Sequence, residues 1–480
     1  MSLASRFASN VLSQGLARLL SIGSNLLLLL VVARVMGADL FGHFSYVLAL
    51  AAISVTFADL GTTAILSQGL VLHEGDQRRR YLGNFLLMRV VLLLPVMLLT
   101  AIAALFVTQQ ERGALLIVAF GLPAMASRFF EPVYQVYGRP WLSLKSNFIF
   151  GFSQIALTVV VFWWPQITIP QLITGHVLSN LLYTLTAIFM MWQLVRPDFR
   201  VHRAMLLSIL KLAAPIGVGA IFSMLLMRLD VILLQHMRSN AEVGYYSAAF
   251  RLIDLAVFFA VTIVTPFITI LSKDIASDNT LALTRARQFT LVTGLLVLPI
   301  ALTVPVLASP LVELVWGSTF APAAEPLRIL MVNFVIVFFS LICYSISVAS
   351  GKVKHAYWVS PLATFVNLIL NLWWIPIYGT TGTAWASVVG QAVVLVAAQW
   401  YVTRDFGQIY VREHWQRLGW ACAALWLFQQ LVLPWGSPWA AAAAGLTVFI
   451  FLVWHWHLLP QSVVNTLCRR PKTPVNAEDS

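Results

Sequence analysis

The sequence has 480 residues, of which 60% are hydrophobic and only 10% are charged, and its formal net charge is +12. A mean hydropathy of +0.85 excludes a soluble protein that hides its apolar residues in one core. We predict an all-α integral membrane protein, because backbone in lipid must satisfy its own hydrogen bonds and no alternation typical of a membrane barrel is present.

Fourteen apolar stretches are long enough to cross a bilayer as helices. In chain order they cover residues 11–33, 41–66, 82–107, 113–136, 145–164, 172–194, 208–234, 244–272, 287–315, 327–350, 355–376, 381–402, 414–434 and 438–459.

The basic residues between these stretches predict their orientation, because Lys and Arg resist transfer across the membrane. With the N-terminus inside, the inner segments hold 21 Lys and Arg residues, whereas the outer links hold four, namely Arg34, Arg112, Arg238 and Arg328. Both termini are therefore expected in the cytoplasm. The positive charge is scattered over eight segments that face membrane lipids, so it does not indicate a nucleic-acid partner.

A weak internal repeat appears when the chain is shifted by 202 positions, which aligns Gly42–Ser45 with Gly244–Ser247. The shift matches the second helix of each half, so we predict two six-helix lobes of like orientation around a central cavity. The predicted boundaries are 1–207 for the first lobe, 208–405 for the second, 406–460 for two further helices and 461–480 for a cytoplasmic tail. Such lobes suit transport by alternating access. A duplication without alternating access is the competing hypothesis.

Several activities lack the residues that they need. The sequence contains no phosphate-binding loop and no soluble stretch long enough for a nucleotide-binding domain. An integral glycan polymerase would carry a sizeable outer loop, and every outer link here is short. No cluster of metal ligands is apparent, so neither an enzyme nor a cofactor-dependent protein is expected.

Ionisable residues inside spans cost about 2.5–3.5 kcal/mol each on insertion, so they tend to face a cavity or a partner. Arg18, Asp59, Arg89 and Arg128 all lie about 10–12 Å from the inner boundary, judged from a helical rise of 1.5 Å per residue. Three arginines against one aspartate make this layer cationic, or less so if Glu131 pairs with Arg128. Guanidinium groups match phosphate oxygens in pairs.

A second layer nearer the outside holds Arg228 and Asp230 in one helix with Arg251 and Asp254 in the next. Its charges sum to zero, and the last two share a helix face and can neutralise each other. We therefore hypothesise that an anionic head group binds the inner arginines and passes outward through this layer. The alternative is that each residue is held in a buried ion pair or reaches the lipid head groups.

A further set of segments is recognisable by its residues. The segments are Arg34–Gly37, Phe41–Gly42, Phe57–Gly61, Arg228–Asp230, Val243–Leu252, Gly317–Leu330 and Asn367–Ser387. Together they resemble the polysaccharide flippases of the multidrug/oligosaccharidyl-lipid/polysaccharide superfamily. The resemblance covers residues from about 5 to 405, and only the combination of segments is specific.

The resemblance implies a carrier that moves an undecaprenyl-diphosphate-linked oligosaccharide from the inner to the outer leaflet of a bacterial inner membrane. The diphosphate would be the anion that the inner arginines bind, and membrane lipids would surround the prenyl tail. A polysaccharide polymerase and a chain-length regulator are the partners expected of such systems. Family members often carry a basic residue soon after the Asp-Leu-Gly motif, where this chain has Leu66-Ser67-Gln68, and Arg89 can compensate.

Two other functions remain open from the sequence. A cation-coupled exporter of small drugs belongs to the same superfamily, but it would use acidic residues, and arginines outnumber them inside the spans. A membrane scaffold for polysaccharide assembly would tolerate neutral substitutions of the inner arginines. Nothing in the sequence chooses between O-antigen, capsule, exopolysaccharide and common antigen as the product, or identifies a coupling ion.

Overall fold

The computed structural model describes residues 3–352 and 356–458 and confirms the all-α prediction, because every regular element in this part of the chain is a helix. Three of the elements are short 3-10 helices. The helices in chain order are α1 (Leu3–Asp59), α2 (Thr62–Leu72), α3 (Gly75–Ala103), η1 (Ala104–Phe106), α4 (Gln109–Met125), η2 (Ser127–Phe129), α5 (Phe130–Val136), α6 (Trp141–Trp163), α7 (Ile169–Leu194), α8 (Arg203–Met237), α9 (Asn240–Ser277), α10 (Asn279–Trp316), η3 (Ser318–Ala323), α11 (Ala324–Ala349), α12 (Ala356–Asp405), α13 (Arg412–Val432) and α14 (Pro438–His455).

Ten helical segments within the described residues are long and apolar enough to cross a membrane. Two of them, Gly15–Leu72 and Trp358–Asp405, each contain two predicted spans, so the ten account for twelve of the fourteen. The remaining two spans coincide with α9 and α13. Inside the merged helices, Gly37 and Gly379 have positive φ angles of 76° and 56°, which break the helical path where links were predicted.

Two predicted spans are not continuous helices, which corrects the sequence-based expectation. The span 41–66 is interrupted where Leu60 and Gly61 adopt left-handed conformations between α1 and α2. The span 113–136 is interrupted by η2, which separates α4 from α5. Interrupted helices leave backbone carbonyls without their usual donors, so other groups must supply hydrogen bonds at both places.

The chain divides into two compact units. Unit 1 comprises residues 1–248, 313–323 and 357–390, and unit 2 comprises residues 249–312, 324–356 and 391–480. The lobe boundaries inferred from the sequence stay a prediction.

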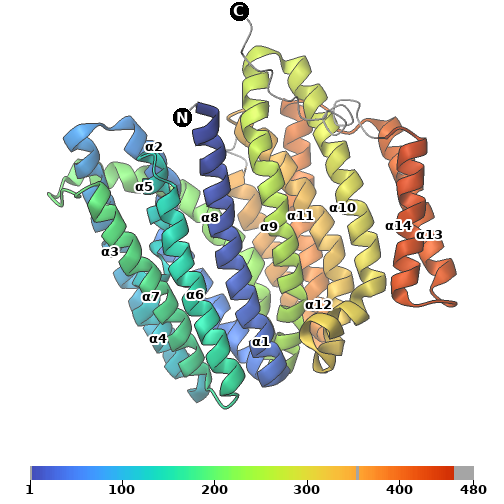
Figure 1. Ribbon diagram of the computed structural model, residues 1–480, viewed down its shortest axis with the longest axis horizontal. Coiled ribbons are helices and arrows are strands. Elements are labelled where there is room, and N and C mark those ends of the chain that lie inside the picture. The colour runs from blue at the N-terminus through green and yellow to red at the C-terminus, as the bar shows by residue number, and fades with distance from the viewer. Residues whose placement is uncertain (1–2, 353–355, 459–480) are drawn as a thin grey trace, which may run out of the picture. The chain divides into compact units, whose positions relative to one another are not determined.

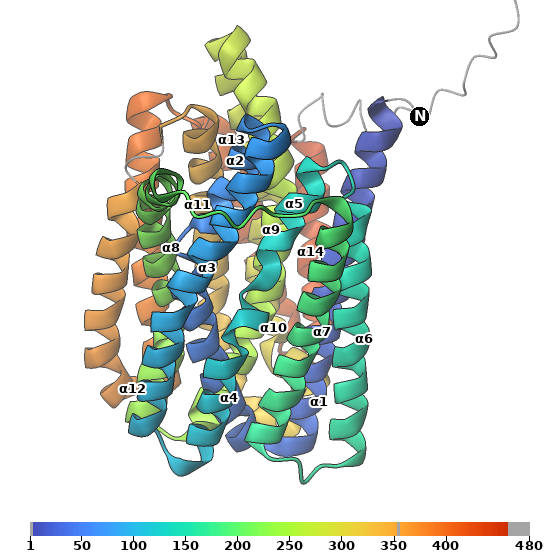
Figure 2. The same cartoon turned by 90° about the vertical axis from the view of Figure 1, so that its left-hand side faces the viewer.

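Within unit 1, α1 packs against α6 and α8, α4 packs against α3 and α7, and α6 packs against α7 (Figures 1 and 2). A buried cluster that includes Phe85, Phe130, Tyr134 and Tyr183 lies among α2, α3, α5, α6, α7 and α8. In unit 2, α13 packs against α14, and one cluster of buried side chains joins α10 to this pair. These cores position the polar groups described next.

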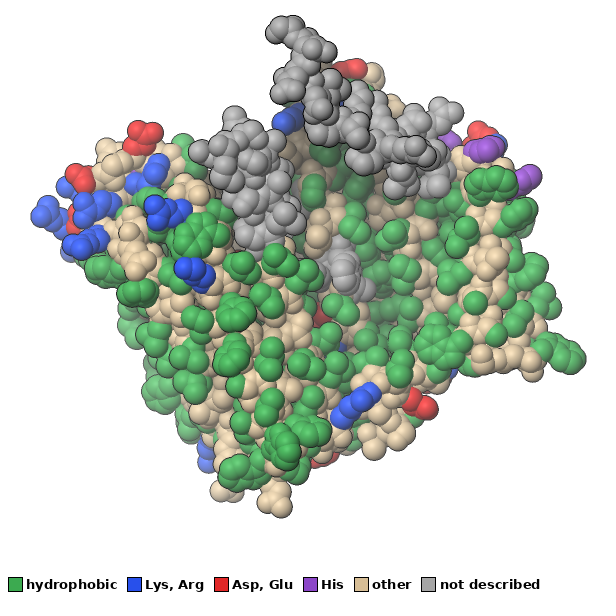
Figure 3. All heavy atoms as spheres, in the orientation of Figure 1, with side chains coloured by type: hydrophobic (Ala, Val, Ile, Leu, Met, Phe, Trp, Pro, Cys, Tyr) green, Lys and Arg blue, Asp and Glu red, His purple; other side chains and the backbone are tan. Residues whose placement is uncertain are grey.

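Basic side chains gather at one end of unit 1, over the start of α3 and the loop that follows α7 (Figure 3). The loop is bound to α3, since Asn84 donates to the carbonyl of Arg200 at 3.0 Å and accepts from the His202 amide at 2.8 Å. Arg80 lies 3.3 Å from Asp198 of the same loop. This segment links α7 to α8, where the sequence predicts the connection between lobes.

The internal repeat is visible as a pair of reciprocal contacts. The Gly42 Cα lies so close to the carbonyl of Asn240 that a Cβ would overlap it, and Gly244 meets the carbonyl of Ala38 in the same way. Gly244 stands 202 positions after Gly42, and Asn240 stands 202 after Ala38. An approximate two-fold relation between α1 and the start of α9 would produce this exchange, and the two lobes of like orientation stay a prediction.

Candidate functional site

Arg89 and Asp59, two of the predicted site residues, form an ion pair within the membrane-spanning region. The Arg89 guanidinium of α3 donates to the Asp59 carboxylate at the end of α1, and to the Thr62 hydroxyl at 3.0 Å. Arg89 is only 3% exposed. The hydroxyl of Thr63 also donates to Asp59. A buried cation needs such a partner because an unpaired charge in a low-dielectric interior is very costly.

The same guanidinium also binds the second helix interruption. It donates to the carbonyl of Ala126, which follows the last residue of α4, and its Cζ lies 4.8 Å from the centre of the Phe129 ring. Arg89 therefore contacts both helix interruptions, through the side chains of Asp59 and Thr62 between α1 and α2 and through the backbone carbonyl of Ala126 between α4 and α5. Because it is buried against Asp59 and the carbonyl of Ala126, Arg89 positions the two helix interruptions and is not accessible to a ligand.

Arg128 is the best-placed group for an anionic ligand among the predicted residues with described side chains. It lies in η2, two residues beyond the carbonyl that Arg89 holds, and its side chain is 38% exposed. The guanidinium donates to Asn147 at 2.6 Å and to Ser21 at 3.2 Å.

Two aromatic rings flank the guanidinium of Arg128. Its Cζ lies 4.7 Å from the Phe150 ring centre and 4.4 Å from that of Tyr183. These contacts orient the planar donor group and leave part of it accessible, which suits recognition of phosphate oxygens.

Glu131 lowers the net charge beside Arg128, as the i, i+3 spacing predicts. The closest charged atoms of the two side chains are 3.8 Å apart, which is a loose pair. Glu131 also accepts from Asn147 at 3.3 Å and from Tyr183 at 3.5 Å. Because neutral groups share the carboxylate, Arg128 keeps part of its capacity for another anion.

Asp230 is fully buried in unit 1 and is held by neutral donors. It accepts from Tyr246 at 2.7 Å, from Asn371 at 2.8 Å and from Ser387. These groups come from α8, α9 and α12, so the carboxylate joins three helices. No group of three or more His, Cys, Asp or Glu with metal-binding geometry occurs among the described residues.

The other predicted residues have different settings. Arg228 is partly buried in α8. Arg251, in unit 2, pairs with Asp254 at 3.3 Å, which confirms the expected contact along one helix face. Arg18 belongs to α1, but its side chain lies outside the described residues. The substrate-binding role assigned from the sequence to all seven residues stays a prediction.

Sequence reasoning missed the neutral and aromatic members of the Arg128 site. Asn147 and Phe150 lie in α6, and Tyr183 lies in α7. A polar residue inside an apolar span is the only signal that the sequence offered for Asn147. Nothing in the sequence indicated that the two rings face the same arginine, since that depends on how α6 and α7 pack.

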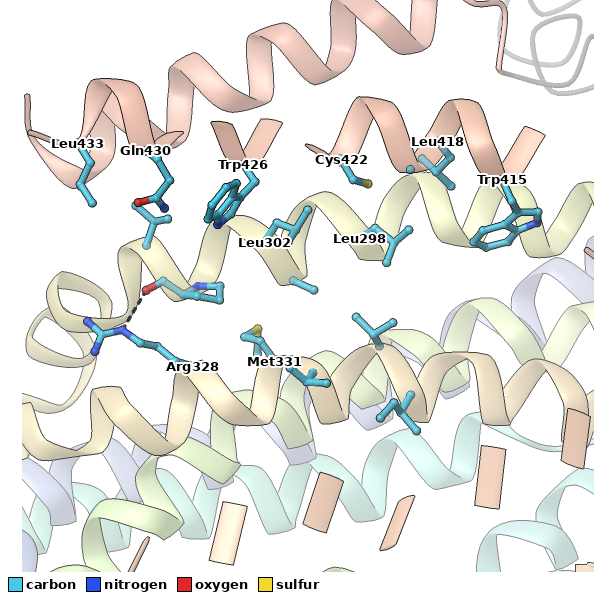
Figure 4. A pocket seen from close by; sticks show the side chains of 17 residues that line it. Leu298, Leu302, Arg328, Met331, Trp415, Leu418, Cys422, Trp426, Gln430 and Leu433 are labelled. Atoms are coloured by element: carbon cyan, nitrogen blue, oxygen red, sulfur yellow. Dashed lines mark hydrogen bonds between the residues drawn. The ribbon is translucent and has the colours of Figure 1, made fainter. Parts of the chain in front are cut away.

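Unit 2 contains an apolar cavity of about 680 Å³ between α13 on one side and α10 and α11 on the other (Figure 4). Trp415, Trp426 and Cys422 line it from α13, with Leu298 and Leu302 opposite. Arg328 lies at one end, where it donates to the Pro305 carbonyl at 3.2 Å.

The model of a family described as polysaccharide biosynthesis protein matches residues 7–272, which is more than half of the chain. The chain belongs to this family. A second family model, MatE, matches residues 215–373. No curated protein matches the chain.

Solved structures show the same fold at low sequence identity. A structure of the lipid II flippase MurJ in an inward closed conformation aligns with a TM-score of 0.76 and 13% identity, covering 95% of this chain and 100% of that one. An inward-facing multidrug-resistance MATE transporter has a TM-score of 0.65 at 12% identity, with coverages of 82% and 98%. A MATE transporter of Vibrio cholerae aligns with a TM-score of 0.58 and 16% identity, covering 84% of this chain and 98% of that one.

These matches place the family member among the transporters of the multidrug/oligosaccharidyl-lipid/polysaccharide superfamily. It is a multi-pass membrane transporter and shares its fold with MurJ and the MATE proteins. The families that it matches contain transporters and not enzymes.

Proposed function

We propose that this transporter moves a polyprenyl-diphosphate-linked oligosaccharide from the cytoplasmic to the outer leaflet of a bacterial inner membrane by alternating access. The observation that carries the proposal is Arg128, a partly exposed guanidinium fixed by Asn147, Ser21 and two rings. A diphosphate is the lipid-linked anion that such a donor group recognises best.

Arg89 has a different part in this proposal from the one suggested by the sequence. Because it is buried against Asp59 and the carbonyl of Ala126, it fixes the turn that carries Arg128. Substrate phosphate meets Arg128, while Arg89 keeps that residue in place. Both chain termini lie in the cytoplasm in this scheme, so Arg128 lies toward the inner leaflet where the cargo is made.

The apolar cavity of unit 2 supports a cargo with a long hydrocarbon tail. Apart from Arg328 and Gln430, the side chains that line it are mainly apolar and offer few hydrogen bonds, which a prenyl chain does not need. The family description, polysaccharide biosynthesis, supports a glycan on the other end of that cargo.

A cation-coupled drug exporter is the second candidate, favoured by the MatE match and by the buried carboxylate of Asp230. Leaflet exchange in proteoliposomes separates the two. A fluorescent polyprenyl-diphosphate glycan is quenched from outside by an impermeant reagent, with a cationic dye as the competing cargo. Faster glycolipid exchange than in protein-free vesicles is expected, whereas dye movement without lipid exchange would overturn the proposal.

A further inference from the structure

A buried polar cluster lies at the opposite end of α4 from Arg128. It consists of His43, Glu111, Gln235 and Asn240, and none of them belongs to the site described above. Glu111 lies in the first turn of α4 and Arg128 beyond its last residue, so the 17-residue helix separates them by about 25 Å. The cluster therefore lies near the other membrane face from the anion site.

The cluster is built around a buried histidine–carboxylate pair. His43 Nδ1 lies 2.9 Å from Glu111 Oε1, and the two residues are 5% and 2% exposed. Gln235 Nε2 donates to the same oxygen at 2.9 Å and to Asn240 Oδ1 at 2.7 Å. Thr108 donates to Glu111 Oε2 through its hydroxyl at 2.8 Å.

These contacts join helices that belong to different predicted lobes. His43 of α1 and Glu111 of α4 come from the first lobe, whereas Gln235 of α8 and Asn240 of α9 come from the second. The helices also touch through backbone at Gly42 and Gly244. Any movement that opens this end of unit 1 between α1 with α4 and α8 with α9 must break the cluster.

Proton occupancy determines the net charge of the pair. Four donors surround the Glu111 carboxylate, including the Thr108 amide at 3.3 Å, and this set fits an ionised group, which only accepts. The charged imidazole and the neutral tautomer with hydrogen on Nδ1 both donate through Nδ1, but only the charged form balances the carboxylate. Loss of one proton leaves a net negative charge in a buried place, which is costly.

The other titratable and charged groups near the pair are engaged elsewhere or exposed. Tyr46 faces Glu111 from α1, and its ring packs at 5.8 Å against His236 of α8. Arg34 and Arg238 bind backbone carbonyls, Glu242 lies beside Gly379, and Asp39 and Arg112 are exposed.

We propose that His43 and Glu111 form a proton-binding site that holds this end of unit 1 closed, and that release of the proton favours its opening. The protonated pair is neutral and stays buried between the helices. The deprotonated pair is stabilised by water, so it favours separation of α1 and α4 from α8 and α9. As the pH rises, the ratio of closed to open molecules then falls by at most about tenfold per pH unit, because one proton is released on opening.

Spin labels on Arg112→Cys and Met237→Cys, which place one label on α4 and one on α8, report this opening in a background without native cysteines. Both positions are exposed. In reconstituted protein without cargo, the pH is raised in steps from about 6 to about 9. The label-to-label distance is expected to shift toward longer values over that range.

Three variants test the assignment. His43→Gln removes the charge of the imidazole and is expected to give long distances at every pH, whereas Glu111→Gln removes the buried anion and is expected to give short distances at every pH. His236→Gln is the matched control and should keep the wild-type response.

An unchanged wild-type distance over the whole pH range, or a pH response of the distance that survives in His43→Gln, would overturn the proposal. Because no cargo is present, either result is separate from glycolipid exchange.

Discussion

At the residue scale, the arginines inside the spans divide into different kinds. Arg89 is buried and donates a hydrogen bond to the backbone carbonyl of Ala126, whereas Arg128 is partly exposed and flanked by aromatic rings. Their sequence positions and depths look alike, and only the packing around them differs. Substitutions should therefore affect transport at one residue and stability at the other.

Arg128→Ala should slow glycolipid exchange. A hydrogen bond to a charged group contributes about 1.5–3 kcal/mol, which corresponds to about a 10-fold to 150-fold loss when phosphate loses its donor. The rate in proteoliposomes measures this effect. Arg417→Ala is the control, because Arg417 is an arginine on α13 that is paired with Glu413 at 2.5 Å and about half exposed. Wild-type exchange in Arg128→Ala would remove this residue from the site.

Asp59→Asn should destabilise the protein by about 3–5 kcal/mol, because it leaves the Arg89 guanidinium buried without its charge partner. Thermal unfolding in detergent measures the change. Glu413→Gln breaks an exposed pair and should cost less than about 1 kcal/mol. The double variant Asp59→Asn with Arg89→Met removes both charges and should recover part of the stability that Asp59→Asn loses. If the loss of stability in the double variant equals the sum of the losses in the two single variants, the two residues do not act as an ion pair.

At the element scale, the interruption between α1 and α2 depends on a close approach to α8. Gly61 has φ of +74°, and a Cβ there would overlap the backbone of Gly217 and Ala213. The Asp-Leu-Gly segment therefore ends one helix, starts another and lets α8 pass at the same point. This explains why small residues are required on both helices at this crossing.

Gly61→Ala should lower thermal stability more than Gly138→Ala. Both glycines have positive φ, so both variants pay about 1–2 kcal/mol for the left-handed conformation. Only Gly61 is crowded, since nothing lies within 4 Å of a Cβ at Gly138. The difference between the two unfolding temperatures isolates the cost of pushing α8 away. Equal effects would show that the crossing tolerates a methyl group.

The loop between α7 and α8 should detach from α3 in acid. The backbone amide of Arg200, and then Arg80, lower the pKa of Asp198 below its usual value. This contribution is present above the ordinary carboxyl pKa and is lost as the pH falls through the lowered one. The protection factors of residues 195–202, which correct for the pH dependence of intrinsic amide exchange, should therefore fall at low pH in the wild type and be low at all pH values in Asp198→Asn. Protection factors in the variant that stay as high as in the wild type at neutral pH would exclude this role.

At the scale of the whole molecule, the orientation in the membrane decides which leaflet Arg128 serves. The excess of basic residues in alternate links predicts cytoplasmic termini. The basic side chains around the start of α3 lie at one end of unit 1 (Figure 3), and the prediction that this end faces the cytoplasm rests on the sequence argument.

Cysteine labelling tests that direction. In a background without native cysteines, an impermeant maleimide should label Arg112→Cys on intact cells, because Arg112 is exposed in an outer link. Arg200→Cys, whose native side chain is 80% exposed in an inner link, should be labelled only after permeabilisation. The reverse pattern would place the termini outside and put Arg128 toward the wrong leaflet for loading.

The sequence alone determined the class, the helical content, the positions of the spans and the repeat, because hydrophobic length and basic links are local properties. It also selected Asp59, Arg89 and Arg128, because charges inside apolar stretches are visible without a fold. The tertiary structure alone decided that Arg89 holds two broken helices while Phe150 and Tyr183 flank Arg128, and that His43 meets Glu111. These pairings join residues far apart in the chain, so they depend on helix packing, which no local pattern encodes.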